Sequence, residues 1–133
     1  MDQTLKKVPV PQFMSDFFTA VDSLNTDGFR RVMAKDVIGV FGDQVFHGVD
    51  AYVKGFLAVD ASVITKHHPV EIFQIGSAFV MSGNCDLTPK GDPKAATNNL
   101  APLLNFFWLN DQGKIVRHVV SFAPEEKPGG YKS

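Results

Sequence analysis

Residues 37–57, VIGVFGDQVFHGVDAYVKGFL, change their hydrophobic period twice. Residues 37–41 and 44–47 favour two short strands, because β-branched and aromatic side chains dominate both. Gly42-Asp43 between them favours a tight turn. After this hairpin the apolar residues recur every three or four positions, which predicts a helix over about 49–61.

The residues before this stretch predict two more helices. Over residues 12–24 the apolar side chains recur at spacings of three and four, which places them on one wide helical stripe. Residues 25–28 interrupt that stripe, and Thr26 or Asp27 is suited to cap a short second helix. We expect residues 1–8, which are polar and basic, to be flexible.

The residues after it predict strands only. Pro69 predicts an edge position or a bulge in the first of them, because proline cannot donate to a β-ladder. A long polar loop at 89–100 interrupts the series, and we expect the tail at 125–133 to be flexible. The predicted strands cover residues 63–75, 78–88, 105–110 and 114–122.

This order of elements predicts a single α+β domain over residues 1–133, with an ordered core at about 11–123. We expect a curved antiparallel sheet, shaped as a cone-like half-barrel. The three helices of the N-terminal half would pack on its concave side. Strong curvature of the sheet would leave a conical cavity between the two layers.

Composition narrows the class of protein. Thirteen basic and fourteen acidic residues are scattered along the chain, which argues against a nucleic-acid partner. No apolar run approaches the roughly 20 residues of a membrane span, and the first residues lack a secretory signal. Cys85 is the single cysteine and cannot form an internal disulfide. We therefore expect a soluble, cytoplasmic protein.

Phenylalanine is unusually frequent. The chain has 12 Phe against two Tyr and one Trp. Phe carries no polar group, so this excess indicates an apolar interior with few hydrogen bonds of its own. Two interpretations stay open: a well-filled core, or a cavity whose walls bind a hydrophobic ligand.

Asp86 is the first candidate catalytic residue. It shares strand parity with Asn84, so both side chains leave the same face of the sheet. If that face is concave, burial among Phe rings would favour the protonated carboxyl and suit Asp86 to acid or base catalysis. The alternative is a solvated face, on which Asp86 only caps the turn at residues 88–89.

His118 is the second candidate. It shares parity with Val120 on the last strand, and it would form an acid–base pair with Asp86 if the strands bring the two together. A hydrogen-bonded structural histidine is the alternative. Asn105 lies on the parity of Phe107 and would orient a ligand carbonyl or satisfy the neighbouring loop backbone.

The remaining histidines are candidate metal ligands. His67 and His68 are adjacent on a strand, so only one of them can face inward. A metal site built from one of these with His47, His118 and Asp86 is conceivable. No ligand spacing supports it, so we expect neither a metal nor a cofactor.

The outer face of the sheet predicts an interface. Phe106 and Trp108 share the parity opposite to Asn105, and apolar residues there favour a homodimer, with a packed core as the competing explanation. By the same alternation Cys85 falls on the outer face, opposite to Asp86. It is therefore not a candidate nucleophile.

Four motifs occur in an informative order: 17–21 FFTAV, 29–33 FRRVM, 45–48 VFHG and 109–118 LNDQGKIVRH. In this order they resemble the nuclear transport factor 2-like (NTF2-like) superfamily, and within it the SnoaL-like group. That group holds polyketide cyclases, ketosteroid isomerases and limonene-epoxide hydrolases. The resemblance covers about residues 12–123.

The resemblance carries over only part of the catalytic apparatus. Where ketosteroid isomerases place a general-base Asp, this chain has Phe41 or, loosely, Asp43. Where cyclases and epoxide hydrolases place an acid on the last strand, it has Val120. A second acid of the epoxide hydrolases is matched by Asp86, but their Arg two residues earlier is Asn84.

The resemblance implies a cofactor-free enzyme acting on a small hydrophobic, cyclic polyketide- or terpenoid-like molecule. It would be an isomerase, cyclase, dehydratase or hydrolase, with Asp86 and His118 as the acid–base pair. The alternatives are a non-catalytic ligand-binding or dimerisation module, and a subunit that supports a separate catalytic chain. The residues expected to contact the substrate are Asn84, Asn105, Phe17, Phe41, Tyr52, Phe56, His67, Phe107 and Val120.

Overall fold

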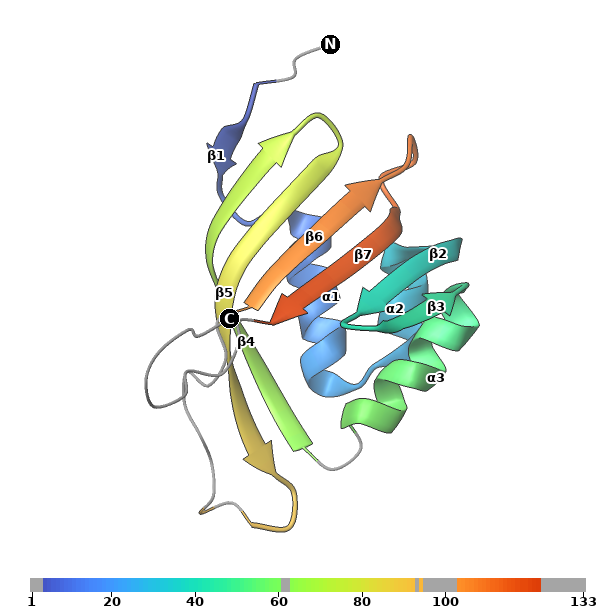
Figure 1. The fold of residues 1–133 in the computed structure, drawn as a ribbon, viewed down its shortest axis with the longest axis vertical. Coiled ribbons are helices and arrows are strands. Elements are labelled where there is room, and N and C mark those ends of the chain that lie inside the picture. The colour runs from blue at the N-terminus through green and yellow to red at the C-terminus, as the bar shows by residue number, and fades with distance from the viewer. Residues whose placement is uncertain (1–3, 61–62, 93, 95–102, 123–133) are drawn as a thin grey trace.

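The computed structural model describes residues 4–60, 63–92, 94 and 103–122 (Figure 1). The tail at 125–133 and most of the loop at 89–100 lie outside these residues. The elements are β1 (Lys6–Val8), α1 (Gln12–Ser23), α2 (Thr26–Val32), β2 (Met33–Phe41), β3 (Gln44–His47), α3 (Val49–Asp60), β4 (Val63–Ile75), β5 (Ala78–Pro89), β6 (Leu103–Leu109) and β7 (Ile115–Phe122).

The strands form one seven-stranded sheet in the order β1-β4-β5-β6-β7-β2-β3. All neighbouring pairs are antiparallel except β2 and β7, which run parallel, with Gly39 opposite His118. Figure 1 shows the three helices on one side of the curved sheet. The predicted α+β fold with helices on the concave side is therefore confirmed. The parallel pair differs from the prediction of an antiparallel sheet. No hairpin joins β2 to β7, so alternation along the chain does not dictate their relative direction.

The bulge predicted at Pro69 is present. The pairing of β4 with β5 shifts register between Pro69 and Glu71. Pro69 lies opposite Gly83, where a side chain would collide with the backbone carbonyl of His68. Proline without its N–H and glycine without a side chain thus permit a close approach, and bulges of this kind bend a strand.

The helices are bounded by local signals. Leu24 adopts a left-handed conformation (φ 52°) and ends α1. Asn25 is the N-cap of α2, because its Oδ1 accepts from the backbone N–H of Gly28 over 3.2 Å. The expectation of a cap at Thr26 or Asp27 is wrong, since those two residues already lie in the first turn.

The core lies between the helices and the concave face. Aromatic rings dominate it and meet edge to face, as Phe13 does with Phe79 and Phe17 with Phe107. Part of the Phe excess is therefore explained by packing. The largest fully buried side chains are Tyr52, Phe17, Phe29, Phe107, Met14 and Met81.

Part of the N-terminal segment forms a strand that the sequence does not predict. Lys6–Val8 forms the edge strand β1, which pairs with β4 so that Val8 lies opposite Ile72. Val8 packs against the core cluster, which gives this segment a hydrophobic contact that its basic sequence conceals. None of the helices within the described residues is long and apolar enough to cross a bilayer.

The outer face carries the aromatic pair that the sequence places there. The rings of Phe106 and Trp108 stack with centroids 6.3 Å apart, and the Arg117 guanidinium lies 5.3 Å from the Trp108 ring. Both aromatic side chains are half-buried within the single chain. The homodimer expected through this face stays a prediction.

Candidate functional site

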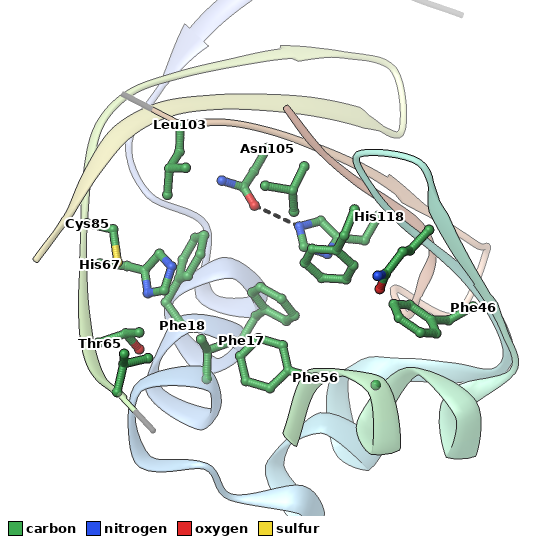
Figure 2. A pocket seen from close by; sticks show the side chains of 16 residues that line it. Phe17, Phe18, Phe46, Phe56, Thr65, His67, Cys85, Leu103, Asn105 and His118 are labelled. Carbon is green, nitrogen blue, oxygen red and sulfur yellow. Dashed lines mark hydrogen bonds between the residues drawn. The ribbon is translucent and has the colours of Figure 1, made fainter. Parts of the chain in front are cut away.

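A pocket of about 470 Å³ lies between the concave face of the sheet and helices α1 and α3 (Figure 2). Its walls are almost entirely apolar, and the exposed Gln44 marks where it reaches solvent. Among the predicted site residues, those that line it are Phe17, Phe41, Phe56, His67, Asn105, His118 and Val120. Lining residues that were not predicted are Phe18, Val21, Gln44, Phe46, Gly55, Val63, Thr65, Cys85 and Leu103.

Strand β5 faces the opposite way from the prediction. Cys85 is 4% exposed and lines the pocket, whereas Asn84 and Asp86 are only half-buried and do not line it. The buried row runs through Phe79, Met81 and Cys85. The expected placement of Asn84 and Asp86 in the hollow, and of Cys85 outside it, is therefore wrong. Alternation separates the two faces of a strand but does not say which is concave.

Asp86 and His118 do not meet. Asp86 Oδ2 lies 2.8 Å from His68 Nε2, so the carboxylate pairs with the histidine that faces away from the pocket. Two other expected contact residues, Tyr52 and Phe107, are fully buried behind the lining rather than in it. The expected acid–base pair is thus replaced by two separate histidine groups, one formed by His118 and one by His67.

The first group is a chain of three buried side chains. Asn105 Oδ1 can only accept, so His118 Nε2 donates to it over 2.7 Å. His118 Nδ1 then accepts from the Tyr52 hydroxyl, also over 2.7 Å. Burial, and secondarily the nearby charge of His67, lower the pKa of His118 to about 3. His118 is therefore a neutral ring that links Tyr52 to Asn105.

Asn105 is the end of that chain. The residue is 2% exposed, and its Nδ2 has no hydrogen-bond partner among the described residues. In Figure 2 this nitrogen points away from His118, toward the end of the pocket that holds His67. A buried amide donor without an acceptor is costly, so this atom favours a ligand that brings an oxygen.

The second group centres on His67. Its Nδ1 donates to Asp22 Oδ1 over 2.6 Å, and its backbone N–H donates to Asp22 Oδ2 over 2.9 Å. The Thr65 hydroxyl also donates to Asp22 Oδ1, over 2.9 Å. These bonds, from β4 to α1, fix the carboxylate and orient the imidazole.

His67 is charged at neutral pH. Burial alone would lower the pKa of His67, but the hydrogen bond to Asp22 and the neighbouring Cys85 outweigh it and raise that pKa to about 9. Phe18 stacks on the imidazole with ring centroids 4.9 Å apart. The pocket therefore holds one cationic and one neutral histidine, an imidazolium donor at His67 and an amide donor at Asn105.

Sequence reasoning missed one functional candidate, Asp22, and excluded another, Cys85. Asp22 lies four residues after Phe18 on α1, so it continues the helical row of the apolar stripe, and that spacing was the available signal. Cys85 lies directly opposite His67 in the pairing of β4 with β5. That neighbour depends on the strand register, which no local motif reveals.

The histidines considered as metal ligands are not brought together. His47 is exposed on β3, His68 pairs with Asp86, and His118 is enclosed by Tyr52 and Asn105. Within the residues that the structure describes, no group of three or more His, Cys, Asp or Glu side chains is placed to hold a metal ion.

No protein-family model matches this chain, and no curated protein sequence matches it. Solved structures do. A Catenulispora acidiphila protein with a ketosteroid isomerase-like fold, in complex with trimethylamine, has a TM-score of 0.74 and 13% identity, over 86% of this chain and 88% of that one.

Two further matches have the same fold. A Shewanella denitrificans protein named for the SnoaL-like polyketide cyclases gives a TM-score of 0.72 at 14% identity, over 84% of this chain and 88% of that chain. An LEH-like epoxide hydrolase from M. tuberculosis gives 0.69 at 14% identity, over 84% and 80%. The chain therefore has the NTF2-like cone fold, as the sequence motifs imply.

Proposed function

We propose that this protein is a cofactor-free enzyme that performs acid–base chemistry on a small hydrophobic molecule carrying one oxygen acceptor. The observation that carries the proposal is the unpaired, buried Nδ2 of Asn105 in an apolar pocket that also contains the His67 imidazolium. Two donors on one oxygen stabilise negative charge as it develops there.

In this proposal His67 is the general acid. Its Nδ1 is held by Asp22, so Nε2 is the nitrogen left to face a ligand or Cys85. Asn105 is oriented by His118 and Tyr52 and binds the substrate oxygen. Isomerisation, cyclisation, dehydration and hydrolysis all require such protonation or polarisation of an oxygen. The Phe side chains would select a cyclic polyketide- or terpenoid-like skeleton.

The alternative is a binding module without turnover. Phe41 and Val120, which stand where related enzymes place acids, both line the pocket. Among the described residues the lining contains no carboxylate at all. A pocket of this kind binds an oxygen-bearing apolar molecule even if no proton is removed from it.

Binding is tested by calorimetry with a bicyclic enone whose β-carbon is fully substituted, so that thiols do not add to it, and with the bicyclic hydrocarbon of the same shape. Because the hydrocarbon leaves Asn105 Nδ2 unpaired, we expect it to bind at least about tenfold more weakly. Asn105→Leu should abolish the preference, and Asn105→Asp keeps the acceptor for His118 as a fold control. Equal affinity of the wild-type protein for both probes would contradict the proposal.

Turnover is tested by incubating the enone with the protein in D2O and following deuterium incorporation by NMR. The enzyme hypothesis expects exchange that His67→Gln abolishes and that His68→Gln, on the other face of β4, leaves unchanged. Binding of the enone without protein-dependent exchange would support the binding module instead.

A further inference from the structure

Cys85 lies at the pocket end that holds His67 and has no role in the proposed acid–base function. Cys85 and His67 are direct partners across β4 and β5, and Figure 2 shows their side chains next to each other at that end. Asp22 holds the other nitrogen of the imidazole over 2.6 Å. Thiol, imidazole and carboxylate thus follow one another, as they do in sites where a cysteine acts as a nucleophile.

We propose that Cys85 is a covalent capture site for hydrophobic electrophiles of the α,β-unsaturated carbonyl class, activated by His67 and oriented toward a carbonyl bound at Asn105. This goes beyond the proposed acid–base function. It needs the same pocket but no turnover, so either proposal can fail alone.

The surroundings of the sulfur favour this role. The neighbouring Cys85 contributes to the raised pKa of His67, so the two side chains are electrostatically linked. An imidazolium beside a cysteine stabilises the thiolate, which is the nucleophilic form. The Cys85 thiol donates to the backbone carbonyl of Asp86 over 3.6 Å, and because a thiol is a weak donor, little is lost when this bond breaks.

Asn105 supplies an independent indication of the ligand. Its Nδ2 is buried, lacks a partner within the described part of the chain, and is directed toward this end of the pocket. A carbonyl oxygen that accepts from Nδ2 would place the conjugated carbon atoms between Asn105 and Cys85, along the apolar wall formed by Leu103. The ligand class follows from the two groups together, since one needs an oxygen acceptor and the other an electrophilic carbon.

The step is a conjugate addition. The Cys85 thiol first gives its proton to water, because the His67 imidazolium already carries both ring protons. The sulfur then donates an electron pair to the β-carbon and forms the C–S bond, while the C=C pair moves toward the carbonyl to give an enolate. Asn105 Nδ2 donates to the enolate oxygen. The His67 imidazolium then gives its Nε2 proton to the α-carbon and is re-protonated by water. The product is a thioether; nothing leaves, and no redox change occurs.

The groups that face His67 are Asp22 from α1, Cys85 from β5 and His118 across the pocket from β7. The pKa of His67 is raised to about 9, so the imidazolium persists through neutral pH. The charge that activates Cys85 is therefore present at pH 7, where the addition rates are compared.

The test uses 3-nonen-2-one as the apolar enone and methyl vinyl ketone as the same reactive group without the chain. Cys85 is the single cysteine, so intact-mass spectrometry assigns the adduct, and Cys85→Ser must remove it. The reference is the same protein unfolded in urea. We expect the folded protein to react with 3-nonen-2-one at least about tenfold faster than the unfolded chain, with a smaller ratio for methyl vinyl ketone.

His67→Gln should bring the folded rate down to or below the unfolded rate, while His68→Gln should leave it unchanged. A folded wild-type protein that reacts more slowly than the unfolded chain would overturn the proposal, because that is how a merely buried thiol behaves. If His67→Gln does not fold, the wild-type rates decide. A folded rate above the unfolded rate for 3-nonen-2-one, with a smaller ratio for methyl vinyl ketone, supports the proposal, and a folded rate at or below the unfolded rate for 3-nonen-2-one overturns it.

Discussion

His118 Nε2 donates to Asn105 Oδ1 over 2.7 Å, and this bond turns the amide nitrogen of Asn105 toward the pocket. The histidine is 1% exposed and receives a second bond from the Tyr52 hydroxyl. A residue that looks like a catalytic base in the sequence therefore works, in this structure, as a neutral spacer. It positions the Nδ2 donor of Asn105 at the pocket wall.

The two pocket histidines should differ in protonation at pH 7. Side-chain ¹⁵N NMR should show His67 as an imidazolium and His118 as the neutral Nε2–H tautomer, since the pKa of His67 is raised to about 9 and that of His118 is lowered to about 3. Titration of His118 near pH 6.5, the value of a free imidazole, would contradict its enclosed place between Tyr52 and Asn105.

The free energy of unfolding should be greatest near pH 6.5, because the contribution of His67 falls above this pH and that of His118 falls below it. Above pH 6.5 the unfolded chain loses the proton that folded His67 keeps, so the free energy of unfolding falls by up to about 3 kcal/mol as pH rises toward 9. Below pH 6.5 the unfolded chain gains a proton that folded His118 refuses, so stability falls again toward pH 3. Urea unfolding across this range measures both arms.

The control for that profile is His67→Gln. It should flatten the alkaline arm and keep the acidic arm, because His118 is untouched. An alkaline arm of the same size in the variant would show that another group causes it.

Tyr52→Phe should destabilise the protein by about 1–3 kcal/mol. The substitution removes the hydroxyl that donates to His118 Nδ1 and leaves a buried nitrogen without that donor. We also expect the ¹⁵N resonance of His118 Nδ1 to shift because it loses its donor, while Asn105 Oδ1 keeps the Nε2–H tautomer. Unchanged stability together with an unchanged Nδ1 resonance would contradict the role given to Tyr52.

Gly39→Ala should cost about 1–3 kcal/mol, because a side chain at Gly39 would overlap the Tyr52 ring. Moving that ring should also loosen the Tyr52–His118 bond and weaken enone binding. Gly91→Ala is the matched control, since no atom of the described residues lies within 4 Å of its added carbon, and it should stay within about 0.5 kcal/mol of wild type. An equal loss of stability in the two variants would show that the close contact of Gly39 with Tyr52 does not support the site.

The fold was predictable because its signals are local. The apolar stripe of α1, the Gly42-Asp43 turn and the bulge at Pro69 each follow from a few adjacent residues. The parallel contact of β2 with β7 was not predictable in the same way. It joins segments far apart in the chain, and nothing in either segment encodes its direction.

The site was predictable only in part, and β5 shows why. Met81 and Cys85 face the core, whereas Asn84 and Asp86 face away from it. The opposite orientation was predicted because Asn84 and Asp86 carry the polar groups that catalysis needs. Burial of a strand is decided by its apolar residues, so the row containing Met81 was the safer guide to the pocket. The role of Asp22 could not be predicted, because its partner His67 lies on a strand more than forty residues later in the chain.

The parallel pairing of Gly39 with His118 also bears on how the chain is made. On the ribosome the β2–β3 hairpin emerges before its neighbour β7, which is synthesised only after β4, β5 and β6. Until β7 is synthesised, the backbone N–H and C=O groups on one edge of β2 lack a partner strand, and the aromatic core is exposed to solvent. A chain in this state is prone to associate with other nascent chains. A chain that stops short of residue 115 should accordingly depend on chaperones, and the complete domain should fold slowly for its size.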